Sequence, residues 1–190
     1  MQFFPEGGNL VNGIQSKIAF RIVGQNGKGI PCAGEIINDK NEPIVKYTSL
    51  KFGMGSFLLT PEANHSYKAV TVLPGGQTVI QALPAAYNDG YVMRFEPGDN
   101  NLLKITIHAT PVNSVSSPIY LFAHTRGSIK SASSEFIKNG YAEFLIDKNK
   151  LGDGISHFTV FNANRQPVCE RLYFKYPEQR LEITMATDKQ

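Results

Sequence analysis

One stretch of the sequence has residue types and spacing that approach a calcium-binding loop. Asp147 stands at the first position, Asn149 at the third and Gly152 at the sixth, as in such a loop. Leu151 occupies the fifth position, where an oxygen ligand is required, and Phe158 occupies the twelfth, where a bidentate Glu is required. Because two strong oxygen ligands are missing, the sequence predicts a polar loop between two strands instead of a calcium site.

The four histidines, His65, His108, His124 and His157, are the other candidates for metal binding or for general base catalysis. No two of them are spaced two residues apart, as two ligands on one face of a strand would be. His108 and His157 fall in runs that alternate between apolar and polar residues, and His65 falls in a loop pattern. We expect hydrogen-bonded surface groups at these positions and not ligands or bases.

Motifs of nucleophilic and nucleotide chemistry are incomplete. Ser56 follows a glycine but lacks the second glycine of a Gly-x-Ser-x-Gly nucleophile elbow. Gly53 and Gly55 lack the rest of a phosphate loop, so a β-bulge or a close approach of two strands explains them better. The sequence has no His-Glu-x-x-His or Cys-x-x-Cys motif. We therefore predict no catalytic residue, no cofactor-binding residue and no metal ligand, and we expect that the protein is not an enzyme.

The two cysteines, Cys32 and Cys169, are too few and too far apart for a zinc site or a disulfide framework. We expect each to be a small buried hydrophobic residue without a bridge between them. After Cys169, strand alternation sends Glu170 to one face and Arg171 to the other. Two interpretations of this charged pair stay open, namely a contact between two modules and an exposed strand face.

The elements that carry these residues follow from a period of two. Ile18, Phe20 and Ile22 alternate with polar or small residues, and Leu103 and Ile105 further along alternate with polar residues, which places one face of each strand on a core. Asn-Gly, Pro and Gly signals interrupt these runs about every 8–12 residues, as in a β-sandwich. Residues 131–138 fit a turn of helix or a strand. The predicted fold class is all-β, with antiparallel sheets.

An internal repeat predicts two modules. Phe4-Pro5-Glu6-Gly7 precedes a core strand, and the similar run from Phe95 to Gly98 precedes another. A second pair of similar segments begins at Gly55 and Gly140. We predict immunoglobulin-like sandwiches at 1–86 and 87–178, joined near Leu83, and the truncated start of a following module at 179–190.

Net charge and hydropathy disfavour nucleic acid and the membrane interior as partners. The net charge of +3 is small and scattered, which disfavours nucleic-acid binding. No run of 18 apolar residues exists, so we expect no membrane insertion. Residues 1–5 lack the pattern of a signal peptide. The chain is then either cytoplasmic or part of a longer exported protein, and the strand-like residues after 179 favour the second alternative.

The order of several motifs resembles the macroglobulin-like domains of bacterial alpha-2-macroglobulin-type exported proteins. The motifs are FFPEGGNLV at 3–11, GKGIP at 27–31, GMGSF at 53–57 and YKA at 67–69. Residues 154–162 and 167–174 resemble the neighbouring module, and 181–189 resemble the opening of the next. The resemblance implies tandem seven-stranded sandwiches in a large protein of a Gram-negative cell envelope, located in the periplasm or at the cell surface.

The resemblance also bounds the function. The thioester motif of protease-trapping members is absent, because Ala33 and Gly34 follow Cys32, and Glu170 and Arg171 follow Cys169. We expect non-catalytic structural and interaction modules whose partners are other domains of the same protein, a protease or an envelope protein. One alternative is the scaffold of a protease-trapping inhibitor. Another is a ligand- or glycan-binding module beside a TonB-dependent receptor, with Tyr87, Tyr91 and Tyr120 as candidate contacts.

Overall fold

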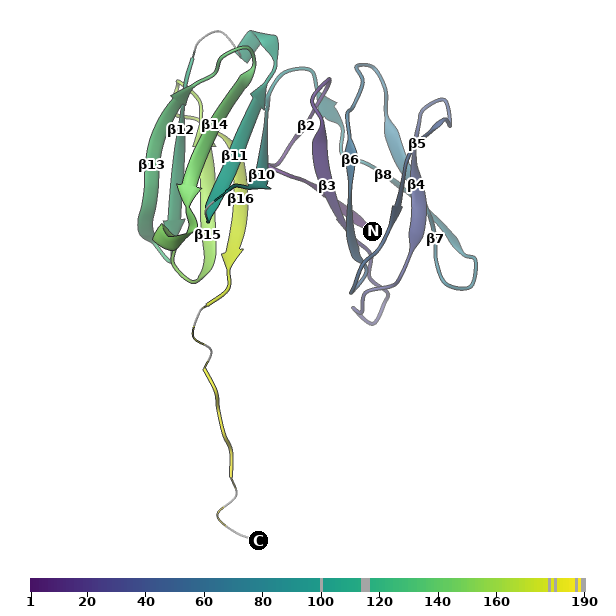
Figure 1. Ribbon diagram of the computed structural model, residues 1–190. Coiled ribbons are helices and arrows are strands. Elements are labelled where there is room, and N and C mark those ends of the chain that lie inside the picture. Colours follow the sequence, from purple (N-terminus) through teal and green to yellow (C-terminus); the bar gives the residue numbers. More distant parts are fainter. Residues whose placement is uncertain (100, 114–116, 178, 180, 187, 189–190) are drawn as a thin grey trace.

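The structure is a computed structural model that describes residues 1–99, 101–113, 117–177, 179, 181–186 and 188. Nearly all of its regular structure is antiparallel β-sheet, and only two single-turn 3-10 helices, Pro111–Asn113 and Lys148–Lys150, occur in these ranges (Figure 1). The predicted all-β fold class is therefore confirmed.

The first half of the chain forms a three-stranded sheet of order β1-β3-β6 and a four-stranded sheet of order β5-β4-β7-β8. The strands of this half are β1 (Gln2–Pro5), β2 (Leu10–Val11), β3 (Ser16–Arg21), β4 (Ala33–Asn38), β5 (Pro43–Thr48), β6 (Met54–Leu59), β7 (Tyr67–Val72) and β8 (Thr78–Ala82).

The second half forms sheets of order β10-β11-β14 and β13-β12-β15-β16. Its strands are β9 (Ala86–Tyr87), β10 (Tyr91–Pro97), β11 (Leu102–Ala109), β12 (Pro118–Thr125), β13 (Ser128–Phe136), β14 (Tyr141–Asp147), β15 (Gly154–Phe161) and β16 (Pro167–Lys175). The strand alternative for residues 131–138 is thus the one the structure adopts.

Both halves have the same connectivity. If the two-residue strands β2 and β9 are set aside and the other strands of each half are numbered in chain order, both halves have sheets of order 1-2-5 and 4-3-6-7. An immunoglobulin constant-type sandwich keeps its fourth strand in the sheet of strands 1, 2 and 5. Here the fourth strand of each half, β5 and β13, pairs with the third strand in the other sheet.

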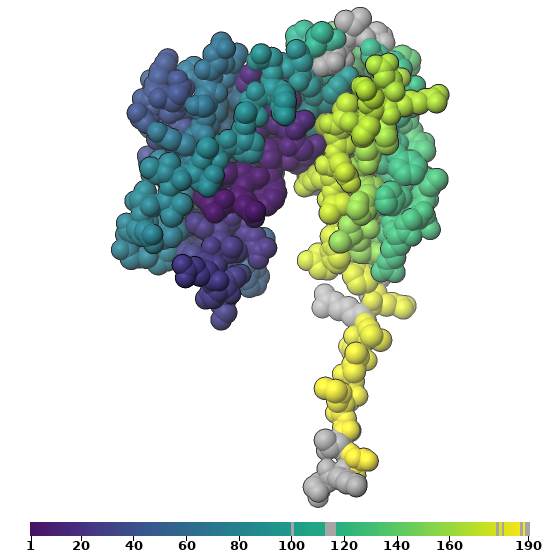
Figure 2. All heavy atoms as spheres, turned by 180° about the vertical axis from the view of Figure 1, so that it is seen from behind, coloured from purple at the N-terminus to yellow at the C-terminus, as the bar shows by residue number. Residues whose placement is uncertain are grey.

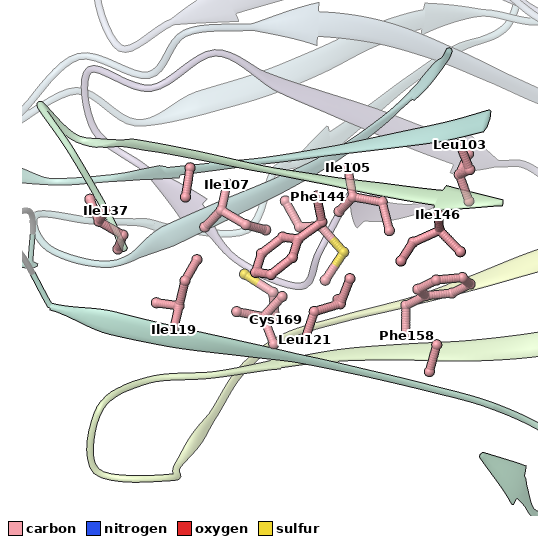
Figure 3. Close-up of a cluster of buried hydrophobic side chains, with 14 of the residues drawn as sticks. Leu103, Ile105, Ile107, Ile119, Leu121, Ile137, Phe144, Ile146, Phe158 and Cys169 are labelled. Carbon is pink, nitrogen blue, oxygen red and sulfur yellow. The ribbon is translucent and has the colours of Figure 1, made fainter. Parts of the chain in front are cut away.

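Each half has its own hydrophobic core between its two sheets. The first core contains Ile18, Phe20 and Ile36, and the second contains Ile105, Leu121 and Phe158, all of them at most 1% exposed. Figure 3 shows side chains of β11 and β14 pointing toward those of β12 and β15 across the second core. Each such side chain contributes about 1.5–3 kcal/mol on burial, so every core is the main stabilising element of its half.

The sequence pattern explains the local structure. In β3, buried and exposed residues alternate without interruption, as the period of two predicted. Gly53 has a φ of +68°, and a Cβ placed there would lie 2.1 Å from the carbonyl oxygen of Ile22. The close approach is therefore between the backbone segments just beyond the ends of β3 and β6, not between two strands, and no larger residue fits at Gly53.

The segment after β16 extends away from both sandwiches (Figure 1). Residues 181–186 belong to no strand, and Leu181, Ile183 and Met185 are exposed. Their alternation is that of a strand, but no strand partner is present among the described residues. Arg180, Thr187, Lys189 and Gln190 of the predicted opening strand lie outside the described residues.

Candidate functional site

The joint between the two sandwiches is centred on Glu6, which follows β1. Its side chain is only 7% exposed and forms an ion pair with Arg171 of β16. The backbone N–H of Phe95 in β10 also donates to Glu6 Oε1, at 3.1 Å. The Arg171 guanidinium lies 4.4 Å from the centroid of the Phe95 ring, in cation–π geometry. A carboxylate of the first half is therefore held by two strands of the second half.

Gly7 continues the joint. Its carbonyl oxygen accepts a hydrogen bond of 3.2 Å from the backbone N–H of Glu170. Its φ is +86°, and a Cβ at this position would lie 3.0 Å from the backbone nitrogen of Met93 in β10. Glycine is needed both for the left-handed backbone and for the close approach to the second half. The Pro-Glu-Gly-Gly run that marked the sequence repeat thus builds the contact between the halves.

Of the charged pair after Cys169, one residue lies at the contact between the halves and the other on an exposed strand face. Arg171 lies at the contact between the halves, as the first interpretation predicted, and burial lowers the pKa of its guanidinium. The Glu170 side chain is exposed, with Oε1 3.5 Å from Nδ1 of His157. Alternation along β16 therefore separates a partly buried charge at the joint from a solvated one.

A second connection lies further along the same segment, which joins β1 to β3. The short strands β2 and β9 pair in parallel, with Leu10 opposite Ala86 and Val11 opposite Tyr87. The Asn12 backbone N–H donates to the Tyr87 carbonyl oxygen at 2.9 Å. Strand β9 spans residues 86 and 87, the positions between which the module boundary was predicted, and both residues pair with the first half.

An open cleft of about 1280 Å³ lies beside this joint. Figure 2 shows the hollow between the N-terminal strands and the yellow β16 segment. Phe4 and Phe52 line one side and Leu172 lines the other, and Lys17 and Lys51 also border it. The three apolar side chains are at least half exposed, so the cleft presents apolar surface from both halves of the chain.

The outer face of the β13-β12-β15-β16 sheet carries a second hollow, of about 610 Å³. Tyr120 of β12 stands directly opposite Phe161 of β15, and Phe122 lies two residues along β12. All three line the hollow. Of these residues, only Tyr120 was named from the sequence, because the strand register that brings Phe161 beside it depends on how the two strands pair.

The other two candidate tyrosines do not reach this hollow. Tyr87 is exposed in β9. Tyr91 packs against the second core, and burial raises the pKa of its hydroxyl. Of the three tyrosines, Tyr120 alone lines a described hollow with other aromatic side chains.

The register also pairs two histidines. His124 of β12 stands opposite His157 of β15, with the rings parallel and their centroids 4.8 Å apart. A search for histidines two apart on one strand misses this pair, since the two side chains come from neighbouring strands. The other two histidines lie apart from this pair. The His108 ring packs against Tyr141, and burial lowers the pKa of His108. His65 Nδ1 lies 2.6 Å from Asp39 Oδ1.

No group of three or more His, Cys, Asp or Glu side chains that could hold a metal ion occurs in the described part of the chain. In the loop that approaches a calcium motif, Asp147 Oδ1 accepts the backbone N–H of Asn149 at 2.9 Å and caps a 3-10 turn. Leu151 is 2% exposed and belongs to the second core. The residue that breaks the motif is therefore a core residue, and the first carboxylate has a capping role.

The two cysteines are buried free thiols in different cores. Burial raises the pKa of Cys169 to about 12 and also raises the pKa of Cys32. Because the thiolate is the reactive form, both side chains act as small hydrophobic residues.

Among the described residues, no helical segment has the length and the apolar character that a membrane-spanning helix requires. No model of a known protein family matches the chain, and no curated protein matches it significantly.

Proposed function

We propose that the two sandwiches are non-catalytic structural and interaction modules of a larger exported protein, and that the joint holds them at one fixed angle. The observation that carries this proposal is the ion pair between the buried carboxylate of Glu6 and the partly buried guanidinium of Arg171, which joins the two halves. Removing one partner while the other stays buried costs about 3–5 kcal/mol, so the closed contact depends on both groups being present.

Three further contacts support a rigid joint. Gly7 accepts from β16, Phe95 donates to Glu6, and β2 pairs with β9. A flexible linker would need none of them, because backbone groups in a linker are solvated. Two modules held in this way would keep the domains before and after them at a fixed distance and orientation in a longer protein. The partners would then be other domains of the same polypeptide, on the extracytoplasmic side of a cell envelope.

The macroglobulin-type assignment rests on the resemblance of the motifs together with the repeated connectivity. The same 1-2-5 and 4-3-6-7 sheets occur in both halves, as expected for tandem copies of one sandwich type. The FFPEGG motif supplies Glu6 and Gly7, so the part of the sequence that carries the resemblance is also the part that fixes the joint.

The experiment that tests this function replaces Arg171 by Met and measures small-angle X-ray scattering and urea unfolding. R171M leaves Glu6 buried without a counter-charge, and we expect a larger radius of gyration and a loss of about 3–5 kcal/mol from the contact. The matched control is K104M, which removes the ion pairs of Lys104 with Glu143 and Glu96, two carboxylates that are 35% and 38% exposed where Glu6 is buried. It is expected to cost about 1 kcal/mol or less and to leave the scattering unchanged.

A scattering curve of R171M that superimposes on that of the wild type, with equal unfolding free energy, contradicts the proposal. An equal increase in radius for both variants also contradicts it, since the effect would then not belong to the joint.

A further inference from the structure

The outer face of the β13-β12-β15-β16 sheet has the composition of a ligand site. Three aromatic residues, Tyr120, Phe122 and Phe161, surround the 610 Å³ hollow together with Ser133, Ser134 and Arg165. Aromatic side chains on an open sheet face leave apolar area in contact with water, and Tyr120 is 38% exposed. Tyrosine and arginine are also the residue types that most often dominate binding energy.

The position of Arg165 is the second observation. It lies in the turn between β15 and β16 with a φ of +59°, a region that side chains other than Gly, Asn and Asp rarely adopt. Its N–H donates to the Asn162 carbonyl at 2.9 Å, and the Asn162 N–H donates to the Gln166 carbonyl at 3.0 Å. An arginine is thus held in strained backbone geometry at the border of the hollow.

The equivalent turn of the first half, between β7 and β8, has the same hydrogen bonds. Gly76 donates to Leu73 at 3.0 Å, and Leu73 donates to Gln77 at 2.9 Å. Gly76 has a φ of +84°, so the first half uses glycine where the second half uses Arg165. Strained residues are found more often at functional sites, and the substitution of glycine by arginine in the equivalent turn, at the border of the hollow, directs attention to the guanidinium of Arg165.

The charge of the hollow indicates the ligand class. Arg165 is exposed, and no ion pair or side-chain hydrogen bond joins it to another residue in the part of the chain that the structure describes. No carboxylate is among the residues that line the hollow. The free guanidinium is complementary to a carboxylate, which it can bind through two parallel hydrogen bonds.

The location on the face of the sheet disfavours an extended peptide. The backbone of β12 pairs with β13 on one side and with β15 on the other, so a peptide cannot add a strand over the hollow. A ligand here must be recognised by side chains alone. Aromatic rings can stack on the apolar faces of sugar rings, and the hydroxyl groups of Tyr120 and of Ser134, which stands opposite it, can bond sugar hydroxyls.

We infer that this hollow binds an acidic oligosaccharide, with Arg165 on the carboxylate of a uronic acid and with Tyr120 and Phe161 against its sugar rings. This site goes beyond the proposed spacing role and does not depend on it. It lies on the second sandwich alone, so a failure of the joint and a failure of the site are separate outcomes.

Isothermal titration calorimetry of the full chain with tetragalacturonate and with hyaluronan tetrasaccharide tests the inference. We expect millimolar or tighter binding of at least one of them, which falls about tenfold or more in R165G and in Y120A. R165G places glycine where the backbone favours it, so its melting temperature should not fall, and lost binding cannot be attributed to unfolding.

The matched control is R126G, which removes another exposed arginine with positive φ from the turn between β12 and β13, away from the hollow. Its affinity should stay within about twofold of the wild type, since only screened, long-range attraction is lost. Undiminished binding by R165G overturns the inference, as does equal affinity for the neutral cellotetraose. If a tetraglutamate peptide binds as tightly as the oligosaccharides, and its binding also depends on Tyr120, the ligand is not specifically a carbohydrate. If neither oligosaccharide binds at 5 mM, the hollow is not a binding site, because that limit corresponds to a binding free energy of only about −3 kcal/mol.

Discussion

The outer faces of the two four-stranded sheets occupy equivalent places in the two halves but differ in chemistry. On the first half, a hollow of about 260 Å³ is lined by Glu35 and Lys46, which stand opposite each other on β4 and β5. On the second half, Tyr120, Phe161 and Arg165 line a hollow of about 610 Å³. The first hollow has opposite charges on neighbouring strands, whereas the second is lined by aromatic side chains and by Arg165 with no carboxylate among its lining residues.

A second comparison concerns the glutamates of the repeated motif. Glu6 is 7% exposed and is bound by the other half of the chain. Glu96 is 38% exposed and lies 3.8 Å from Lys104 and from Arg94, both within its own half. The same short motif therefore builds a joint in one copy and a solvated strand in the other. The two halves therefore share their strand connectivity but differ in their surface residues. Contacts between the halves are found where the surface residues of the two copies differ.

The largest expected effect tests whether the two cores are independent. Phe20→Ala and Phe158→Ala each remove a fully buried ring from one core and should each cost about 3–5 kcal/mol. Hydrogen exchange should show lost protection in β3 and β6 for F20A and in β12 and β15 for F158A. Loss of protection throughout the chain in both variants would mean that the halves share one core and would break the comparison.

An intermediate effect separates the joint from ordinary turns. Gly7 and Gly75 have φ values of +86° and +91°, but a Cβ at Gly75 has no atom within 4 Å, whereas one at Gly7 meets Met93. Gly75→Ala should cost about 1 kcal/mol through backbone strain alone. Gly7→Ala should cost about 1–3 kcal/mol more, because it also overpacks the contact between the halves. Equal urea midpoints for the two variants would show that the contact of Gly7 with the second half does not contribute to stability.

The smallest effect sharpens the comparison of the two equivalent turns. Gly76→Arg introduces into the first half the residue that the second half has at this position, and it should lower the unfolding free energy by about 1 kcal/mol. Thermal unfolding measures the change. If G76R were as stable as the wild type, the backbone at Arg165 would carry no strain, and the argument for a selected guanidinium would lose its energetic basis.

Much of the fold could be predicted from the sequence, because alternation reports which face of a strand is buried. Ile18, Phe20 and Phe158 lie where the period of two places them, and Leu151 breaks the calcium pattern because it is a core residue. These features depend on the local alternation of apolar and polar residues, which the sequence shows directly.

The candidate sites could be predicted only in part, because they depend on strand register and on contacts between distant segments. His124 meets His157, and Tyr120 meets Phe161, only once β12 and β15 pair in one particular register. Glu6 and Arg171 are 165 residues apart (171 − 6), and one sequence does not show that they meet. Alternation did send Arg171 and Glu170 to opposite faces of β16, which was the one available signal.

The fixed angle between the halves is tested most directly by a distance between spin labels. Lys40→Cys and Lys138→Cys place labels at exposed turns of the two sandwiches, while both native thiols are buried. Pulsed electron paramagnetic resonance should give one narrow distance distribution, which broadens when R171M is added. A broad distribution in the chain with intact Arg171 would show that the halves move freely and would contradict the account.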